Sequence, residues 1–454
     1  MTISFFRLAE AVRSSYWLVP TVMAVLAVLL GILMIWVDVQ VGTGWMSNVS
    51  WYQQIKADGA REVLSTIAGS MITVAGVVFS ITMVAISFAS GQYGPRVLTN
   101  FMTDRGNKVT LGTFIATFLY CLAVLRTVRG GDDAAFVPQF SVVVALLLAV
   151  CSIGVLIYFI HHIPQSIHIN TVAAKIGRQL VAGAAERFPS CIGEGGEAPK
   201  DEPGLQEGWG LSAPVRSHAT GYIQAIATKS LLRVACEHNL VLRLHYRPGD
   251  FVVAGRTLLE CVPAERLDEE AADALRGCFS TGALRTPAGD MNFLINELVE
   301  IAARALSPGV NDPFTAVTCM DWLGAGATEI ARRRLPSPVR KDEQGQPRLI
   351  AQPDDFGLFV ELSFARLRQY AAADMIAALH LLRVLGEVAI SCPLEEQVRS
   401  LAAEARHLAQ LAEQQLDGAC REEVRQRAAA LQAVLSRPHD RRSAHHADWL
   451  DGSA

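Results

Sequence analysis

The stretch from Val63 to Ala89 decides the fold class of this protein. It reads VLSTIAGSMITVAGVVFSITMVAISFA, and its 27 residues include no charged side chain. The hydrocarbon core of a bilayer is about 30 Å thick, and about 20 residues of α-helix cross it. The stretch is therefore long enough and apolar enough to predict a transmembrane helix.

Three further stretches in the first third of the chain have the same character. We predict a transmembrane domain over residues 1–165, with four spans at about 16–37, 63–89, 109–128 and 139–160. A single uncharged run could instead be a buried helix of a large soluble core, but four such runs disfavour that alternative. The third run is the shortest, and it reaches full length if Arg126 extends its side chain to the membrane interface.

The composition agrees with a membrane protein. The 454-residue chain is 51% hydrophobic and 19% charged, whereas soluble globular proteins average about 25% charged residues. Its net charge of −4 provides no strong positive field, so we expect no nucleic acid among its partners.

The sequence carries no motif of a known catalytic or metal site. Its nine cysteines form no Cys-x-x-Cys pair, and no Walker loop, His-Glu-x-x-His or Gly-x-Ser-x-Gly motif occurs. We therefore predict no catalytic residues, no metal site and no cofactor, and we do not expect an enzyme.

The distribution of charged residues predicts the orientation in the membrane. Positively charged loops favour the cytoplasm. The loops on one side of the membrane carry Arg7, Arg13, Arg96, Arg105, Lys108, Lys175 and Arg178. The loops on the other side are less positive: they carry Lys56, Arg61 and Arg129 together with the acidic residues Asp38, Asp58, Glu62, Asp132 and Asp133. We predict a multi-pass protein of the bacterial inner (plasma) membrane with both termini in the cytoplasm. No acidic residue lies within a predicted span, so the sequence predicts no proton relay there.

Two of the predicted spans carry a polar stripe. Because a helix advances 100° per residue, small and hydroxyl residues of the second span share one face, and hydroxyl residues of the third span share another. Such faces either pack helices closely together or line a water-filled path. The candidate pore-lining residues are Ser65, Gly69, Thr73, Gly76, Ser80, Ser87, Thr110, Thr113, Thr117 and Tyr120.

Two arginines lie at the non-cytoplasmic end of the third span. Arg126 either extends to the lipid headgroups or pairs with Asp132 or Asp133. Alternatively, Arg126 and Arg129 supply positive potential to an outer vestibule that favours anions.

Several segments together resemble a known family. They are FSITMVAISFASGQYGPR (79–96), VTLGTF (109–114), LRTVR (125–129), GYIQ (221–224) and ALSPGVNDPFTA (305–316). They resemble a bacterial predicted-membrane-protein family, a domain of unknown function with four N-terminal transmembrane helices and an Ala-Leu-Ser-Pro-Gly-x-Asn-Asp-Pro motif. The resemblance extends to about residue 435 and implies an integral membrane protein with a cytoplasmic C-terminal region. It implies no activity and no catalytic or binding residue.

The rest of the chain predicts a cytoplasmic α+β domain. We expect an amphipathic helix and linker over residues 166–211, a small β domain over 212–263, a helical domain over 264–436 and a disordered tail over 437–454. The β segment has the cadence of a biotinyl/lipoyl-type barrel-sandwich hairpin, but it lacks the Met-Lys-Met tip that carries such a cofactor. The fold class is thus a four-span α-helical membrane protein with a barrel-sandwich-like unit and a helical C-terminal part.

A short loop in the helical region has two interpretations. Ser307, Gly309, Asn311 and Asp312 lie in a segment that predicts a tight connection between two helices. The first helix has Asp290 as its predicted N-cap, and the second has Asp312 as its N-cap and Pro313 in its first turn. Alternatively, the free N–H groups of that helix start hold an anionic ligand, although the carboxylate of Asp312 would weaken it.

These observations leave two functional hypotheses. The first is a homo-oligomeric channel or solute pathway gated by the cytoplasmic domain, because four helices per chain cannot easily enclose a pore. The second is a membrane-anchored sensor or scaffold whose cytoplasmic domain binds a partner or a small ligand. The expected partners are membrane lipids, further copies of the chain and a possible small ligand.

Overall fold

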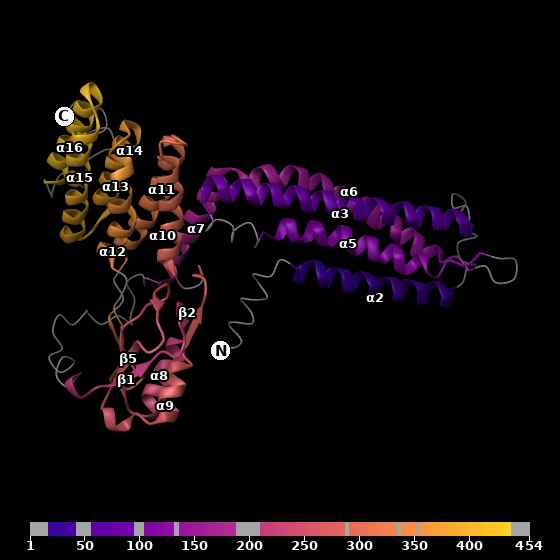
Figure 1. The fold of residues 1–454 in the computed structure, drawn as a ribbon, viewed down its shortest axis with the longest axis horizontal. Coiled ribbons are helices and arrows are strands. Elements are labelled where there is room, and N and C mark those ends of the chain that lie inside the picture. The colour runs from indigo at the N-terminus through magenta and orange to yellow at the C-terminus, as the bar shows by residue number, and fades with distance from the viewer. Residues whose placement is uncertain are drawn as a thin grey trace. The chain divides into compact units, whose positions relative to one another are not determined.

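The computed structural model describes residues 17–41, 56–94, 104–130, 136–187, 209–286, 290–333, 337–351 and 355–436. The chain divides into two compact units, one ending at Thr171 and the other continuing from Val172 (Figure 1). The predicted tail and most of the predicted linker lie outside the described residues, as do Arg7, Arg13, Arg96, Asp132 and Asp133.

Four long helices make up the described part of the first unit. They are α2 (Leu18–Val41), α3 (Ala57–Tyr93), α5 (Arg105–Leu125) and α6 (Gln139–Ile167), and each is long and apolar enough to cross a membrane. The four long apolar helices predicted in the first third of the chain are therefore confirmed. The helices begin or end beyond several predicted limits: α3 starts at Ala57 rather than Val63, and α6 continues to Ile167.

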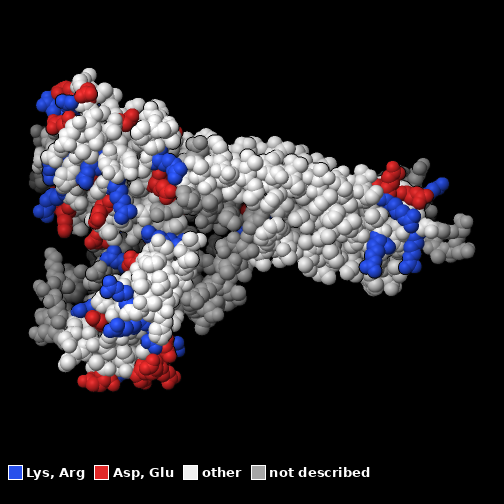
Figure 2. All heavy atoms as spheres, viewed as in Figure 1, with Lys and Arg blue, Asp and Glu red and all other residues white. Residues whose placement is uncertain are grey.

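The inside of this unit is filled with side chains. Helix α5 contacts each of the other three helices, and Phe114, Tyr120 and Phe159 are almost completely buried among them. Apolar side chains also cover the outside, where Val150 and Ile157 are about two-thirds exposed (66% and 65%). Figure 2 shows the drawn face of the four helices almost free of charge, with charged residues gathered at one end. An apolar outer surface is what a lipid environment requires.

The second unit begins with α7 (Ile169–Arg187) and continues into an α/β region. The helix agrees with the predicted amphipathic segment. The next elements are η4 (Trp209–Leu211), β1 (Ala213–Arg216), β2 (Gly221–Ile226), α8 (Thr228–Glu237), β3 (Val241–Leu244), β4 (Phe251–Val252), β5 (Thr257–Val262), η5 (Ala264–Arg266), α9 (Glu269–Arg276) and β6 (Phe279–Gly282).

Two small sheets share one apolar core in this region. The five-stranded sheet has the order β1-β5-β3-β8-β7, with β7 (Val339–Lys341) and β8 (Pro347–Ile350), and the three-stranded sheet has the order β4-β2-β6. Every pairing is antiparallel except β3 with β8, which places Leu242 opposite Leu349. Both of these side chains belong to the same buried cluster as Ile223 of the smaller sheet.

The predicted end of the β domain at residue 263 is too early. Strand β6 pairs with β2, and the β7–β8 hairpin pairs with β3, so the sheets recruit strands from the region predicted as helical. These strands have three or four residues each. Such short strands do not show the alternation on which a sequence-based assignment depends.

The C-terminal part is helical, as predicted. It consists of α10 (Met291–Ala305), α11 (Pro313–Ala331), α12 (Phe356–Val360), the π-helical turn η6 (Glu361–Ala365), α13 (Arg366–Ala371), α14 (Met375–Ser391), α15 (Glu395–Gln415) and α16 (Gly418–Leu435). Aspartate carboxylates accept backbone N–H groups at the starts of α10, α11, α12 and α14. The N-caps predicted at Asp290 and Asp312 are among them.

A glycine-to-alanine pair on α7 tests the packing of the second unit. A methyl group on Gly177 would overlap the indole of Trp322 on α11, whereas one on Gly183 would meet no described atom within 4 Å. Gly177→Ala should destabilise the protein by about 1–3 kcal/mol, because overpacking forces neighbouring groups apart. Gly183→Ala should leave stability unchanged or raise it, since alanine favours a helix. Thermal unfolding of the two variants measures the difference, and equal melting temperatures would contradict the packing.

The buried carboxyl of Glu404 on α15 predicts a pH-dependent stability difference. Burial raises its pKa above 4.5, although Arg368, whose Nη1 lies 2.8 Å from Oε2, opposes the shift. A carboxyl with a raised folded-state pKa stabilises the fold below its ordinary pKa, and that contribution is lost as pH rises through the raised value. Glu404→Gln, which mimics the protonated form, should match the wild type near pH 4 and become the more stable of the two toward pH 7.

The control for this prediction is Glu422→Gln on the surface of α16. Arg425 holds the pKa of Glu422 below its ordinary value. The Glu422→Gln variant should therefore be less stable than the wild type above pH 4.5. The unfolding midpoint of each variant is compared with that of the wild type between pH 4 and pH 7. The comparison shows whether Glu404→Gln stabilises and Glu422→Gln destabilises the protein as the pH rises. A Glu404→Gln difference that does not change with pH would show that burial does not govern this carboxyl.

Candidate functional site

The polar stripe predicted on the second span lies on the outside of α3. Ser65, Gly69, Thr73, Gly76, Ser80 and Ser87 are all exposed in the single chain, and we call them the α3 polar face. The hydroxyls of Ser65, Thr73 and Ser80 bond to carbonyls of their own helix: Thr73 Oγ1 donates to the Gly69 carbonyl at 2.8 Å and Ser80 Oγ to the Gly76 carbonyl at 2.9 Å. The face therefore presents hydroxyl oxygens outward without leaving their protons unpaired.

The α3 polar face points away from the other helices. Residues that α3 buries in the bundle, such as Met71, Val78 and Ala85, lie on the opposite side of the helix. A methyl group built on Gly69 or Gly76 would meet no described atom within 4 Å. The surface at these glycines is open, so another helix could approach the α3 backbone closely.

The stripe predicted on the third span lies inside the bundle. Thr117 Oγ1 and Ser152 Oγ of α6 are 3.0 Å apart, and the Tyr120 hydroxyl donates to the Ser141 carbonyl at 3.0 Å. Thr113 bonds to the carbonyl of Val109 in its own helix. The hydroxyls of Thr117 and Tyr120 therefore join helices within one chain, and the two predicted stripes do not line a common space within it.

A buried carboxylate joins α2 to α6. Asp38 is 8% exposed, and its two oxygens accept the backbone N–H groups of Phe140 at 2.8 Å and Ser141 at 3.0 Å and the Ser141 hydroxyl at 2.6 Å. This carboxylate caps the first turn of α6, whose N–H groups have no partner within the helix. We call this set of bonds the Asp38 clamp.

The expectation that no acidic residue lies within a span is wrong: Asp38 lies in α2, and Asp58 and Glu62 lie near the start of α3. Helix α2 continues to Val41 and includes the aspartate, because the partner for its charge comes from another helix. The apolar residues on both sides of it, Ile35–Val37, Val39 and Val41, are the sequence signal for this continuation. No local sequence pattern indicates that Ser141, 103 positions later in the chain, bonds to Asp38.

The arginines at the same end of the bundle differ in their surroundings. Arg61 Nη2 donates to the carbonyl of Val128 at 3.1 Å, which ties α3 to the end of α5. Arg126 and Arg129 are exposed, as a charge at a membrane interface or vestibule would be. The proposed partners of Arg126, Asp132 and Asp133, lie outside the described residues.

The loop between α10 and α11 is a tight connection. The Asp312 N–H donates to the Ala305 carbonyl at 2.8 Å, and Ser307 Oγ to the Arg304 carbonyl at 2.6 Å. Asn311 adopts a φ of 50°, which asparagine tolerates better than most residues. The Asp312 carboxylate accepts the Thr315 N–H, so the helix start that was considered for an anion already has a negative group.

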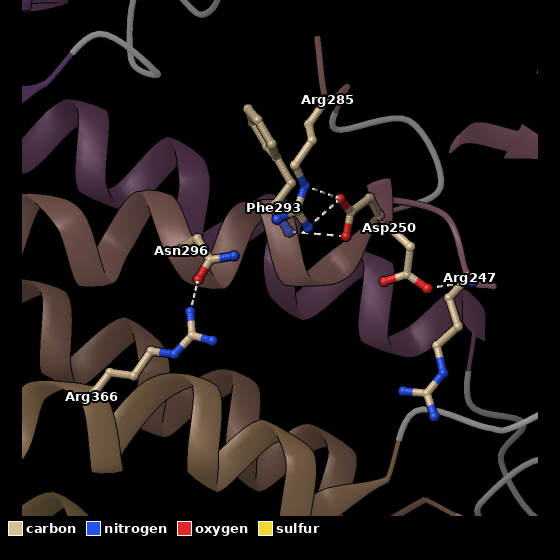
Figure 3. A network of polar contacts seen from close by, with 7 residues as sticks. Arg247, Asp250, Arg285, Phe293, Asn296 and Arg366 are labelled. Atoms are coloured by element: carbon tan, nitrogen blue, oxygen red, sulfur yellow. Dashed lines mark hydrogen bonds and ion pairs between the residues drawn. The ribbon is translucent and has the colours of Figure 1, made fainter. Parts of the chain in front are cut away.

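A polar network and a small pocket adjoin one turn of the β region. Figure 3 shows the labelled side chains: Asp250 closes the turn by accepting the Arg247 N–H, and Asn296 of α10 accepts Arg366 Nη1. Arg285 pairs with Asp290 at 2.6 Å. A pocket of about 210 Å³ lies at the same turn, and it is lined by Leu244, His245, Tyr246, Arg247, Asp250 and Ala351. The sequence analysis missed this pocket, because its members have no motif spacing.

Comparison with known proteins gives relatives but no described activity. An uncharacterized protein of Mycobacterium bovis is 30% identical over 391 residues, which cover 84% of this chain and 73% of the relative. An uncharacterized protein of Mycobacterium tuberculosis has the same identity and coverage. No solved structure matches the chain.

The family resemblance is confirmed by a match over most of the chain. The family described as "Predicted membrane protein (DUF2254)" matches residues 13–387, which include the four apolar helices and the α/β region. The chain therefore belongs to the DUF2254 family of predicted membrane proteins.

Proposed function

We propose that the protein is a homo-oligomeric membrane channel for ions and other small polar solutes, in which copies meet on the α3 polar face. The observation that carries this proposal is the outward direction of that face: a stripe of glycines and hydroxyls on the lipid-accessible surface of a helix that can cross a membrane. Elsewhere the exposed surface of these helices is rich in large apolar side chains, such as Leu29 and Ile157.

The chemistry of the face favours a second copy over lipid. Association of helices in a bilayer depends on close packing, and small residues allow the backbones to approach. Gly69 and Gly76 provide an open surface of this kind, about two turns apart on α3. The same face on each of several copies would converge on the axis of a closed ring.

A pathway between copies agrees better with the packing than a pathway within one chain. The interior of the four helices contains Phe114, Tyr120 and Phe159, each almost fully buried. The hydroxyls of Thr73 and Ser80 donate to their own helix and keep lone pairs that point outward. Such oxygens can replace part of the hydration shell of a solute.

The proposal includes an orientation and a role for the second unit. The excess of Lys and Arg in the loops on one side favours a plasma-membrane protein with both termini in the cytoplasm. In that orientation the α/β and helical region lies at the cytoplasmic end, where we assign it the role of a gate. We assign the protein no catalytic chemistry.

A sensor or scaffold is the second candidate function. The specific observation in its favour is the pocket of about 210 Å³ beside His245, Arg247 and Asp250, which is smaller than a typical small-molecule site and whose charged and polar lining fits only a small polar ligand. A sensor would bind its ligand or partner through residues 212–436, and this binding would be indifferent to changes in the α3 polar face.

Leucine substitutions on α3 test the proposed assembly and pathway together. In Gly69→Leu/Gly76→Leu, the new side chains should hold neighbouring helices apart, so the complex should dissociate to single copies and its conductance should be lost. Light scattering of the detergent-solubilised protein gives the number of copies, and planar-bilayer recording gives the conductance.

The matched control is Gly154→Leu on α6. Gly154 is also exposed, and a methyl group on it would meet no described atom within 4 Å, so this variant should keep the copy number and conductance of the wild type. A monomeric wild type, or an oligomer that only Gly154→Leu disrupts, would contradict the proposed assembly. An α3-dependent oligomer without conductance would refute the pathway alone.

A further inference from the structure

Buried polar side chains gather at the end of the bundle where α5 begins. Asn107, Lys108 and Thr110 are 2%, 4% and 1% exposed, although they lie in the first two turns of a helix that can cross a membrane. The sequence analysis placed Lys108 in a loop before the span; the helix starts at Arg105 instead and takes the lysine into the bundle. Neither the α3 polar face nor the Asp38 clamp involves these residues.

Two of these side chains have an atom without a hydrogen-bond partner. Asn107 Oδ1 and Thr110 Oγ1 are buried and make no hydrogen bond to any described residue. Residues three apart on a helix are neighbours on its surface, so the two atoms belong to one small region. Unpaired buried polar atoms are rare in folded proteins, and an ordered water or an ion usually accounts for them.

The mouth of this region is a histidine–aspartate pair. His162 Nε2 of α6 lies 3.0 Å from Asp104 Oδ1, and these side chains are 24% and 19% exposed. Asp104 also accepts the backbone N–H of Asn107 at 3.1 Å. Gly106 leaves room for the imidazole, because a methyl group there would lie 2.8 Å from His162 Nε2. The pair is therefore partly exposed, whereas Asn107 and Thr110 are both buried.

The chemistry around the unpaired atoms favours a neutral occupant. Two unpaired oxygens are too few ligands for a bound Ca²⁺ or Mg²⁺ ion, which takes about six oxygen ligands. The Asp104 carboxylate and the acceptor oxygen of Asn107 disfavour an anion. A small molecule that both donates and accepts hydrogen bonds satisfies the amide oxygen and the threonine hydroxyl together, and water has this chemistry.

The hydroxyls deeper in α5 are already paired. Thr117 bonds with Ser152, and Tyr120 donates to the Ser141 carbonyl. They leave no comparable demand for water beyond Thr110.

We propose that each chain contains a blind, water-filled pocket that opens beside the Asp104–His162 pair and ends at Thr110. This pocket lies inside the four-helix bundle. It is therefore distinct from the proposed pathway between copies and does not depend on it.

Two cysteine substitutions on the same helix test the pocket. Thr110→Cys and Thr117→Cys are made in the full-length protein in nanodiscs and exposed to methanethiosulfonate ethylammonium, with modification of each peptide measured by mass spectrometry. Thr110→Cys should react at least about tenfold faster than Thr117→Cys, because only a hydrated thiol ionises readily. Native Cys121, which is fully buried on α5, is an internal control in both samples. Equal rates at the two positions would overturn the pocket.

Valine substitutions provide a second readout that does not require a cysteine. Thr110→Val should lower the melting temperature if its hydroxyl binds water, and should raise it if the hydroxyl is dry and unpaired; the second result contradicts the proposal. Thr117→Val should lower it in either case, since it breaks the bond to Ser152. Gly69→Leu/Gly76→Leu should leave the labelling of Thr110→Cys unchanged, so a failure of the α3 pathway is distinguishable from a failure of the pocket.

Discussion

Polar groups surrounded by hydrocarbon need partners within the protein, and this constraint organises the first unit. At the start of α6 the Asp38 clamp supplies the partner from another helix. On α3 the partner comes from the helix itself, because Thr73 and Ser80 donate to carbonyls one turn earlier. That local bond allows a row of hydroxyls to face outward without unpaired protons.

The two polar stripes consequently have different roles. On α5, a central helix, the hydroxyls of Thr117 and Tyr120 bond to α6 and hold the chain's own helices together. On α3 the small residues leave an open surface at Gly69 and Gly76. The middle of the bundle is thus filled by Phe114, Tyr120 and Phe159, whereas the α3 polar face is exposed and differs in composition from the apolar surface around it. The proposed function follows from that difference.

The four spans and the aspartate N-caps could be predicted because their signals are local. A run such as 63–89 is longer and more apolar than a helix or strand of a soluble protein requires. Asp290 stands directly before the helix that it caps. The side on which each stripe lies could not be predicted, since periodicity gives a face but not its neighbour. The Asp38 clamp joins residues more than 100 positions apart, and β6 is too short to alternate. Both depend on tertiary contacts that a single sequence does not display.

The central claim is that copies of the chain meet on the α3 polar face, and distances between spin labels on different copies test it most directly. Labels are attached at Ser80 on that face or at Val150, which is exposed on α6. Distances between labels are then measured by pulsed electron–electron double resonance in nanodiscs. The account predicts a short, narrow distance distribution for Ser80 and a longer one for Val150. No distance between copies at Ser80, or a shorter distance at Val150, would contradict it.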